Sequence, residues 1–196
     1  NLHCSLLPAY RGAAPIQHAL INNETTTGVT YFEINQKLDE GKIVLNKAYT
    51  IKESDNCTAV QDNLTEIAVE CCSEAIDKIC AKEYIQSTLI EKPTYAKKIK
   101  KEDAFLNWDM NVRAMFNMIR ALHLWPVARI NLFGDNIKIL DANCIEKKHE
   151  YSTGTVVSFN KNELVIAAKE GFLSILSIPS GVSFIKLLQS KTIISA

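Results

Sequence analysis

Three polar residues, Asn1, His3 and Asp39, have the side chains needed to perform chemistry together. Alternate residues of a strand share one face, so Asn1 and His3 would point the same way at the end of a strand. An amide and a protonated imidazole can stabilise an oxyanion, and a His/Asp pair can carry a proton near neutral pH. These groups suit transfer of an acyl group to an amine without an acyl-enzyme. A structural histidine and an ordinary turn at Asp39 explain the same residues, and the pattern alone leaves these readings open.

The first half of the chain has the element order of an α/β protein. Apolar runs and turn residues predict four elements before residue 52: a strand over 1–7, a helix over 15–21, and strands over 28–34 and 43–51. Apolar residues then recur at three- and four-residue steps from Val60 to Ile79, which predicts one amphipathic helix capped by Ser54 or Asp55. This order is typical of the back half of an α/β sheet domain.

The second half is predicted to be mostly strands. One helix is expected from Val112 to Leu122, ended by Trp125-Pro126, with Trp125 buried. The predicted strands are 127–133, 137–145, 155–159, 163–168, 172–178 and 182–188. Several short strands with one helix, in under a hundred residues, indicate a small OB-like β-barrel.

The net charge of zero conceals two halves of opposite charge. Residues 1–91 hold 7 Lys/Arg and 13 Asp/Glu, and residues 92–196 hold 15 and 9. Five lysines lie in the acid-free run from Lys92 to Lys101. We therefore expect an α/β domain over 1–87, a basic linker over 88–104, and a barrel over 105–196. The charge alone leaves two readings of the basic half open, phosphate binding and a solvated lysine-rich linker.

Composition excludes several classes of protein. The chain is 47% hydrophobic and 22% charged, which argues against disorder, and no apolar run is long enough for a transmembrane helix. Its six cysteines lack CxxC or zinc-type spacing, so we expect a reducing compartment and no metal. The chain begins at Asn1, inside a predicted strand, and we expect it to be a fragment lacking the N-terminal half of the first domain.

A longer pattern surrounds the first two candidate residues. It reads Asn1-x-His3-x-Ser5-Leu6-Leu7-Pro8-x-x-Arg11-Gly12-x-x-Pro15, with a Leu38-Asp39-x-Gly41 turn further on. This pattern resembles that of the formyltetrahydrofolate-dependent formyltransferases, and most closely the members that act on methionyl-tRNA. Further matches at Tyr95-Ala96, Ile119-Arg-Ala121 and Trp125-Pro126 extend the resemblance over nearly the whole chain.

The resemblance implies a fold, a reaction and roles for particular residues. The fold would be the C-terminal part of a Rossmann-like formyltransferase domain followed by the barrel. Asn1, His3 and Asp39 would be catalytic, and Ser5, Leu6, Leu7 and Pro8 would border tetrahydrofolate. The formyl donor would be 10-formyltetrahydrofolate and the acceptor initiator methionyl-tRNA, for translation initiation. A monomer in the bacterial cytoplasm or an organellar matrix, without membrane contact, is expected, and the fragment alone is expected to be inactive.

At four places this sequence departs from the family pattern, and these departures limit which residue roles the resemblance assigns to this chain. Lys37 and Lys42 change the charges around the Asp39 turn, Leu124 replaces a proline, and Val182-Ser183 stand where a Lys-Lys pair is usual. Two alternatives remain: folate-dependent formylation of an amino sugar or other small amine, and an RNA-binding module without catalysis. The basic second half favours an RNA acceptor over a small amine.

Overall fold

The computed structural model describes residues 1–85, 92–132 and 134–179, and the predicted strand 182–188 with Val182-Ser183 lies outside them. The chain divides into two compact units, Asn1–Ile99 and Lys100–Ala196. This division falls inside the range predicted as a linker. No helix in the described ranges is long and apolar enough to cross a bilayer.

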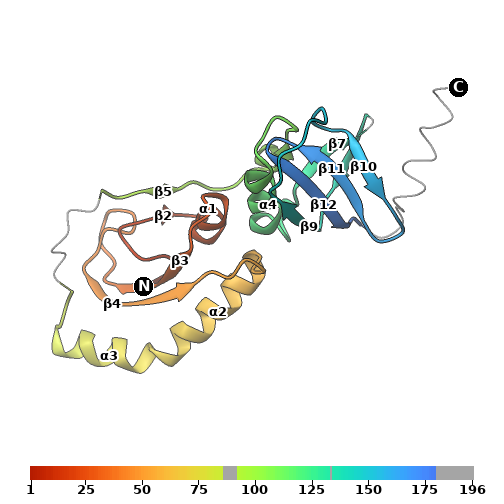
Figure 1. Ribbon diagram of the computed structural model, residues 1–196. Helices are drawn as coiled ribbons and strands as arrows, with labels where there is room; N and C mark the ends of the chain where they lie inside the picture. Colours follow the sequence, from red (N-terminus) through yellow and green to blue (C-terminus); the bar gives the residue numbers. More distant parts are fainter. Residues whose placement is uncertain (86–91, 133, 180–196) are drawn as a thin grey trace, which may run out of the picture. The chain divides into compact units, whose positions relative to one another are not determined.

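The first unit is built on a three-stranded antiparallel sheet (Figure 1). Its strands are β1 (Leu2–His3), β3 (Thr26–Phe32) and β4 (Ile43–Thr50), in the spatial order β1-β3-β4. Helix α1 (Pro15–Ile21) starts with a proline, which is tolerated in a first helical turn because its missing N–H would have no intrahelical partner. A second pair of short strands, β2 (Arg11–Gly12) and β5 (Tyr95–Ala96), is parallel.

The predicted long helix is two helices, α2 (Cys57–Glu70) and α3 (Cys72–Ala81), separated at Cys71. The predicted caps are also wrong, because Asn56 caps α2 by accepting a hydrogen bond from the Ala59 amide at 3.0 Å. Asp55 is engaged elsewhere: its Oδ2 accepts from the Tyr49 hydroxyl at 2.7 Å and the Lys52 amide at 2.8 Å. The periodicity was correct, and Val60, Leu64 and Ala75 are buried.

The part of the second unit that the structure describes contains two separate sheets. One has the order β6-β7-β8, from β6 (Phe105–Leu106), β7 (Arg129–Leu132) and β8 (Asp135–Lys138). The other has the order β10-β11-β12-β9, from β9 (Asp141–Ile145), β10 (Val156–Phe159), β11 (Leu164–Ala168) and β12 (Gly171–Ser177). Helix α4 (Val112–Ala121) contributes Val112, Met115 and Ile119 to their shared core.

The described strands of this unit do not form a closed barrel, and together with α4 they make a mixed α/β unit. The predicted single strand 137–145 is divided, and the chain changes sheets between its two parts. The Ile139 amide bonds the Ala128 carbonyl beside β7, whereas the Leu140 amide bonds Ser177 of β12. Trp125 is 51% exposed, so its predicted burial is wrong.

Candidate active site

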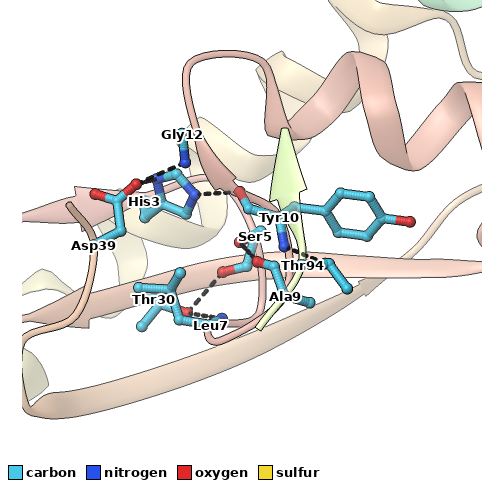
Figure 2. Close-up of polar contacts among 9 residues, drawn as sticks. All are labelled: His3, Ser5, Leu7, Ala9, Tyr10, Gly12, Thr30, Asp39 and Thr94. Carbon is cyan, nitrogen blue, oxygen red and sulfur yellow. Dashed lines mark hydrogen bonds and ion pairs between the residues drawn. The ribbon is translucent and has the colours of Figure 1, made fainter. Parts of the chain in front are cut away.

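His3 is held between a backbone carbonyl and a carboxylate. It lies in β1, opposite Thr30 of β3, and only 7% of the residue is exposed. Its Nε2 lies 2.8 Å from the Tyr10 carbonyl oxygen, which can only accept, so Nε2 carries a hydrogen (Figure 2). Its Nδ1 lies 3.7 Å from Asp39 Oδ2, an ion-pair distance when the ring is protonated. The ring orientation therefore leaves Nδ1 as the nitrogen that can gain a proton.

Asp39 lies in the turn between β3 and β4, in a left-handed conformation with φ 51°. Aspartate tolerates this conformation better than most residues because its short polar side chain can hydrogen-bond locally. Here its Oδ2 accepts from the Gly12 amide at 2.8 Å, and this bond directs the carboxylate toward His3 (Figure 2). The side chain is 11% exposed.

Ion pairs fix the same turn on both sides of Asp39. Glu40 accepts from Arg11 Nη1 at 2.7 Å, and Lys37 Nζ lies 3.4 Å from the other Glu40 oxygen. Lys42 pairs with Glu33 at 3.8 Å. Lys37 and Lys42, two departures from the family pattern, thus have acidic partners within the turn or at its base.

Asn1 and Asp39 line one pocket of about 370 Å³. The backbone of Asn1 is anchored to β3: its nitrogen donates to the Phe32 carbonyl at 2.8 Å, and its carbonyl accepts from the Phe32 amide at 3.0 Å. The rest of the wall is Phe32 and the turn residues 34–38. The structure therefore brings the three predicted catalytic residues together, Asn1 and Asp39 in the pocket wall and His3 against Asp39.

The predicted folate-binding residues lie outside the wall of the pocket that Asn1 and Asp39 line. Among the residues that the structure describes, the wall of this pocket contains none of Ser5, Leu6, Leu7 and Pro8. They form a loop whose polar groups bond within the protein: Ser5 Oγ donates to the Ala9 carbonyl at 2.6 Å. The Thr30 hydroxyl donates to the Ser5 carbonyl at 2.6 Å and accepts from the Leu7 amide at 3.0 Å (Figure 2).

Sequence reasoning missed the groups that orient His3 and Asp39. The Tyr10 carbonyl and the Gly12 amide are backbone groups, so the residue types at these positions do not predict their hydrogen bonds to His3 and Asp39. Thr30 is 0% exposed, but β3 also contains Thr26, Thr27 and Tyr31, so the sequence did not single out its hydroxyl. Thr94, which binds the Tyr10 amide, lies in the range predicted as linker, and no sequence pattern identified it.

The second unit carries a separate basic and aromatic hollow of about 580 Å³. Its lining includes Lys147, Lys148, Tyr151 and Phe172. His149 also lines it, and its Nε2 lies 2.8 Å from the Ala168 carbonyl oxygen and 2.9 Å from that of Gly171. Exposed cations beside aromatic rings are the surface chemistry that single-stranded nucleic acids bind.

Comparisons with known proteins identify both units. The family model described as formyl transferase matches residues 1–76, and the model of the formyl transferase C-terminal domain matches residues 98–184. A methionyl-tRNA formyltransferase of Thermodesulfovibrio yellowstonii is 39% identical over the whole chain, and one of Staphylococcus aureus is 35% identical over 87% of it. The chain spans 62% and 55% of these two relatives.

The fold also resembles that of solved structures. A sugar 3N-formyltransferase, WlaRD, solved in the presence of dTDP and 5-N-formyl-THF, matches with a TM-score of 0.74 at 21% identity. The match covers 93% of this chain and 65% of that one. At this identity, the likeness establishes the shared fold.

Proposed function

This chain belongs to the formyl transferase family, and from that premise we propose that it transfers a formyl group from 10-formyltetrahydrofolate to the amino group of initiator methionyl-tRNA. The curated relatives named methionyl-tRNA formyltransferase support this assignment, one along the whole chain and one along 87% of it. Because the chain spans less than two thirds of those relatives, the activity, substrates and partners of the whole protein are part of the proposal.

The observation that carries the proposal is the pocket shared by Asn1 and Asp39, with His3 directly behind Asp39. Its wall suits a flat heteroaromatic ring, since Ile34 and Leu38 present exposed apolar side chains beside the amides of Asn35 and Gln36. Apolar surface can cover the faces of such a ring while amides bond its polar edge. We assign this pocket to the formyl-bearing end of the donor.

The reaction uses the three side chains as follows. Attack of the acceptor amine on the formyl carbon forms the new C–N bond and places negative charge on the formyl oxygen, to which the Asn1 amide donates a hydrogen bond. The amine must lose a proton, and His3 Nδ1 is free to accept it because Nε2 is bound to Tyr10. Asp39, 3.7 Å from Nδ1, stabilises the resulting imidazolium. The bond between the formyl carbon and the donor nitrogen then breaks, and the proton on His3 passes to that nitrogen, which restores the neutral ring and completes the transfer.

Ser5, Leu6, Leu7 and Pro8 are proposed to border the tetrahydrofolate from outside the pocket wall. Their loop is rigid, because Thr30 and the internal Ser5–Ala9 and Ala9–Leu6 hydrogen bonds fix its backbone. A loop fixed in this way loses little conformational entropy when it receives a ligand.

The second unit is proposed to hold the tRNA. Lys97, Lys98, Lys100 and Lys101 are exposed in the run that joins the units, and the hollow with Lys147, Lys148 and Tyr151 adds a second basic surface. Lysines that neutralise phosphates release counterions, so binding should weaken steeply with salt.

The finer assignments follow from the same family. We propose that residues 1–87 belong to a Rossmann-like catalytic domain, 88–104 to a basic linker and 105–196 to an OB-like tRNA-binding domain. We also propose that the protein acts as a monomer in the bacterial cytoplasm or an organellar matrix.

The decisive test is folate-dependent formylation of methionyl-tRNA by the full-length protein. Asn1→Ala should lower kcat by about 10²–10³-fold, the usual cost of one oxyanion donor. His3→Ala and Asp39→Ala should each lower it by about 10²–10⁴-fold, the range of general acid–base catalysis. Glu66→Ala, an exposed position on α2, serves as the control. Full turnover in all three site variants would overturn the mechanism.

The same assay separates the two alternatives. An amino-sugar formyltransferase would formylate a dTDP-amino sugar, and filter binding at low salt would show no affinity for tRNA or a flat salt dependence. A pure RNA-binding module would bind tRNA and show no turnover with either acceptor, and His3→Ala would leave its biological activity unchanged.

A further inference from the structure

The loop Tyr10–Gly12 orients both members of the catalytic pair. Its first residue provides the carbonyl that binds His3 Nε2, and its last provides the amide that binds Asp39 Oδ2. Between them, Arg11 pairs with Glu40, the neighbour of Asp39. The distance between His3 and Asp39 therefore depends on the position of three consecutive residues.

This loop does not have a locally favoured conformation. Tyr10 has φ 58° and Gly12 has φ 116°, in the region that L-residues rarely adopt. A tyrosine in the left-handed region is disfavoured and persists where surrounding contacts hold it. The loop thus needs an external support.

Thr94 provides that support from 84 residues away in the sequence. Its Oγ1 accepts from the Tyr10 amide at 2.8 Å, and its carbonyl accepts from the Arg11 amide at 2.9 Å. The following strand, β5, continues the contact, since the Ala13 amide bonds the Ala96 carbonyl at 2.9 Å. Figure 2 shows Thr94 beside Tyr10, on the far side of that residue from His3.

We propose that Thr94 is a positioning residue for the catalytic pair, acting through the loop Tyr10–Gly12. A continuous path joins the Thr94 hydroxyl, the amide and carbonyl of Tyr10, and His3 Nε2. Both family models leave out residues 77–97, so neither match assigns Thr94 a role. The inference rests on the proposed function for its kinetic consequence, but its structural part is independent of the reaction.

Strand β5 approaches the loop too closely for any side chain at position 12. A Cβ on Gly12 would lie 2.7 Å from the Ala96 carbonyl oxygen. The loop therefore lies directly against the β5 backbone, and we expect a shift of Thr94 to displace Tyr10 and Gly12.

Thr94→Val removes the hydroxyl with little change in volume, and Thr94→Ser retains it. In the full-length protein, Thr94→Val should lower kcat about tenfold while the KM values for the formyl donor and the tRNA stay within about twofold, because one neutral hydrogen bond is lost and the catalytic pair shifts. Thr94→Ser should restore most of kcat. Thr65→Val is the matched control: this exposed threonine of α2 donates from its hydroxyl to the Gln61 carbonyl at 2.8 Å, within its own helix, so kcat should not change.

A second readout needs no substrate. The His3 ring nitrogens and the Gly12 amide, followed by ¹⁵N NMR across a pH titration, should change in Thr94→Val and return in Thr94→Ser. Unchanged kcat and His3 signals in a folded Thr94→Val protein would overturn the proposal, as would equal loss in the valine and serine variants. If the wild-type protein shows no turnover but the His3 and Gly12 signals change in Thr94→Val, the proposed function is refuted and the positioning role of Thr94 stands.

Discussion

The Thr30 hydroxyl offers a sharp test of the site's architecture. Thr30 is fully buried and faces His3 across the β1–β3 pair. Its hydroxyl donates to the Ser5 carbonyl and accepts from the Leu7 amide, so it satisfies two backbone groups of the loop at once. Thr30→Val replaces the hydroxyl with a methyl group of similar size and leaves both backbone groups unpaired.

The magnitude follows from those two groups. A buried polar group left without a partner costs about 1–3 kcal/mol, so Thr30→Val should lower the free energy of unfolding by about 2–6 kcal/mol. Thr30→Ser keeps both hydrogen bonds and loses one buried methyl, at a cost of about 1 kcal/mol. If burial of apolar surface alone decided the free energy of unfolding, Thr30→Val would be more stable than Thr30→Ser. The hydrogen bonds predict the reverse order.

Urea unfolding of the full-length protein measures this order, and hydrogen exchange of the Leu7 amide localises it. We expect Thr30→Val to show the lower midpoint, the faster Leu7 exchange and a raised KM for the formyl donor, because the Ser5–Pro8 loop loosens. A Thr30→Val protein as stable as Thr30→Ser would refute the role given to the hydroxyl.

Three further predictions follow from other parts of the structure. Gly41→Ala should lower kcat about 100-fold in the formylation assay, because its Cβ would overlap the Glu33 carbonyl oxygen and displace the Asp39 turn; full activity would contradict this reading. Burial and the Asp55 hydrogen bond raise the pKa of Tyr49 to about 12, so the folded state retains a proton that the unfolded chain releases near pH 10. The free energy of unfolding should therefore fall as pH rises from 10 to 12, and fall less in Tyr49→Phe, as urea titrations at each pH would show. Replacing Lys147 and Lys148 by alanine should weaken tRNA binding in filter assays and reduce the salt slope by about 2, whereas an unchanged slope would exclude this surface.

Local patterns account for much of the fold. The helix from Pro15 to Ile21 and the strands Thr26–Phe32 and Ile43–Thr50 lie close to their predicted ranges. Their signals are a proline at a helix start and apolar runs beside turns, which depend on near neighbours in the chain. The division at Cys71 and the change of sheet at 139–140 were missed, because apolar periodicity continues through both.

The candidate site also has one part that the sequence predicted and one part that it did not. Residue types and spacing named Asn1, His3 and Asp39, because the chemistry of amide, imidazole and carboxylate is a property of the side chains. The sequence also showed that the two halves of the chain carry opposite charge.

Only the tertiary structure decided how those side chains are aimed. The His3 ring is oriented by a carbonyl of Tyr10, Asp39 by an amide of Gly12, and the loop between them by Thr94. Backbone donors and acceptors are present at nearly every position, so residue identity cannot reveal which of them meet. Their pairing is set when residues 7, 27 and 84 positions apart come into contact, and those contacts form only in the folded chain.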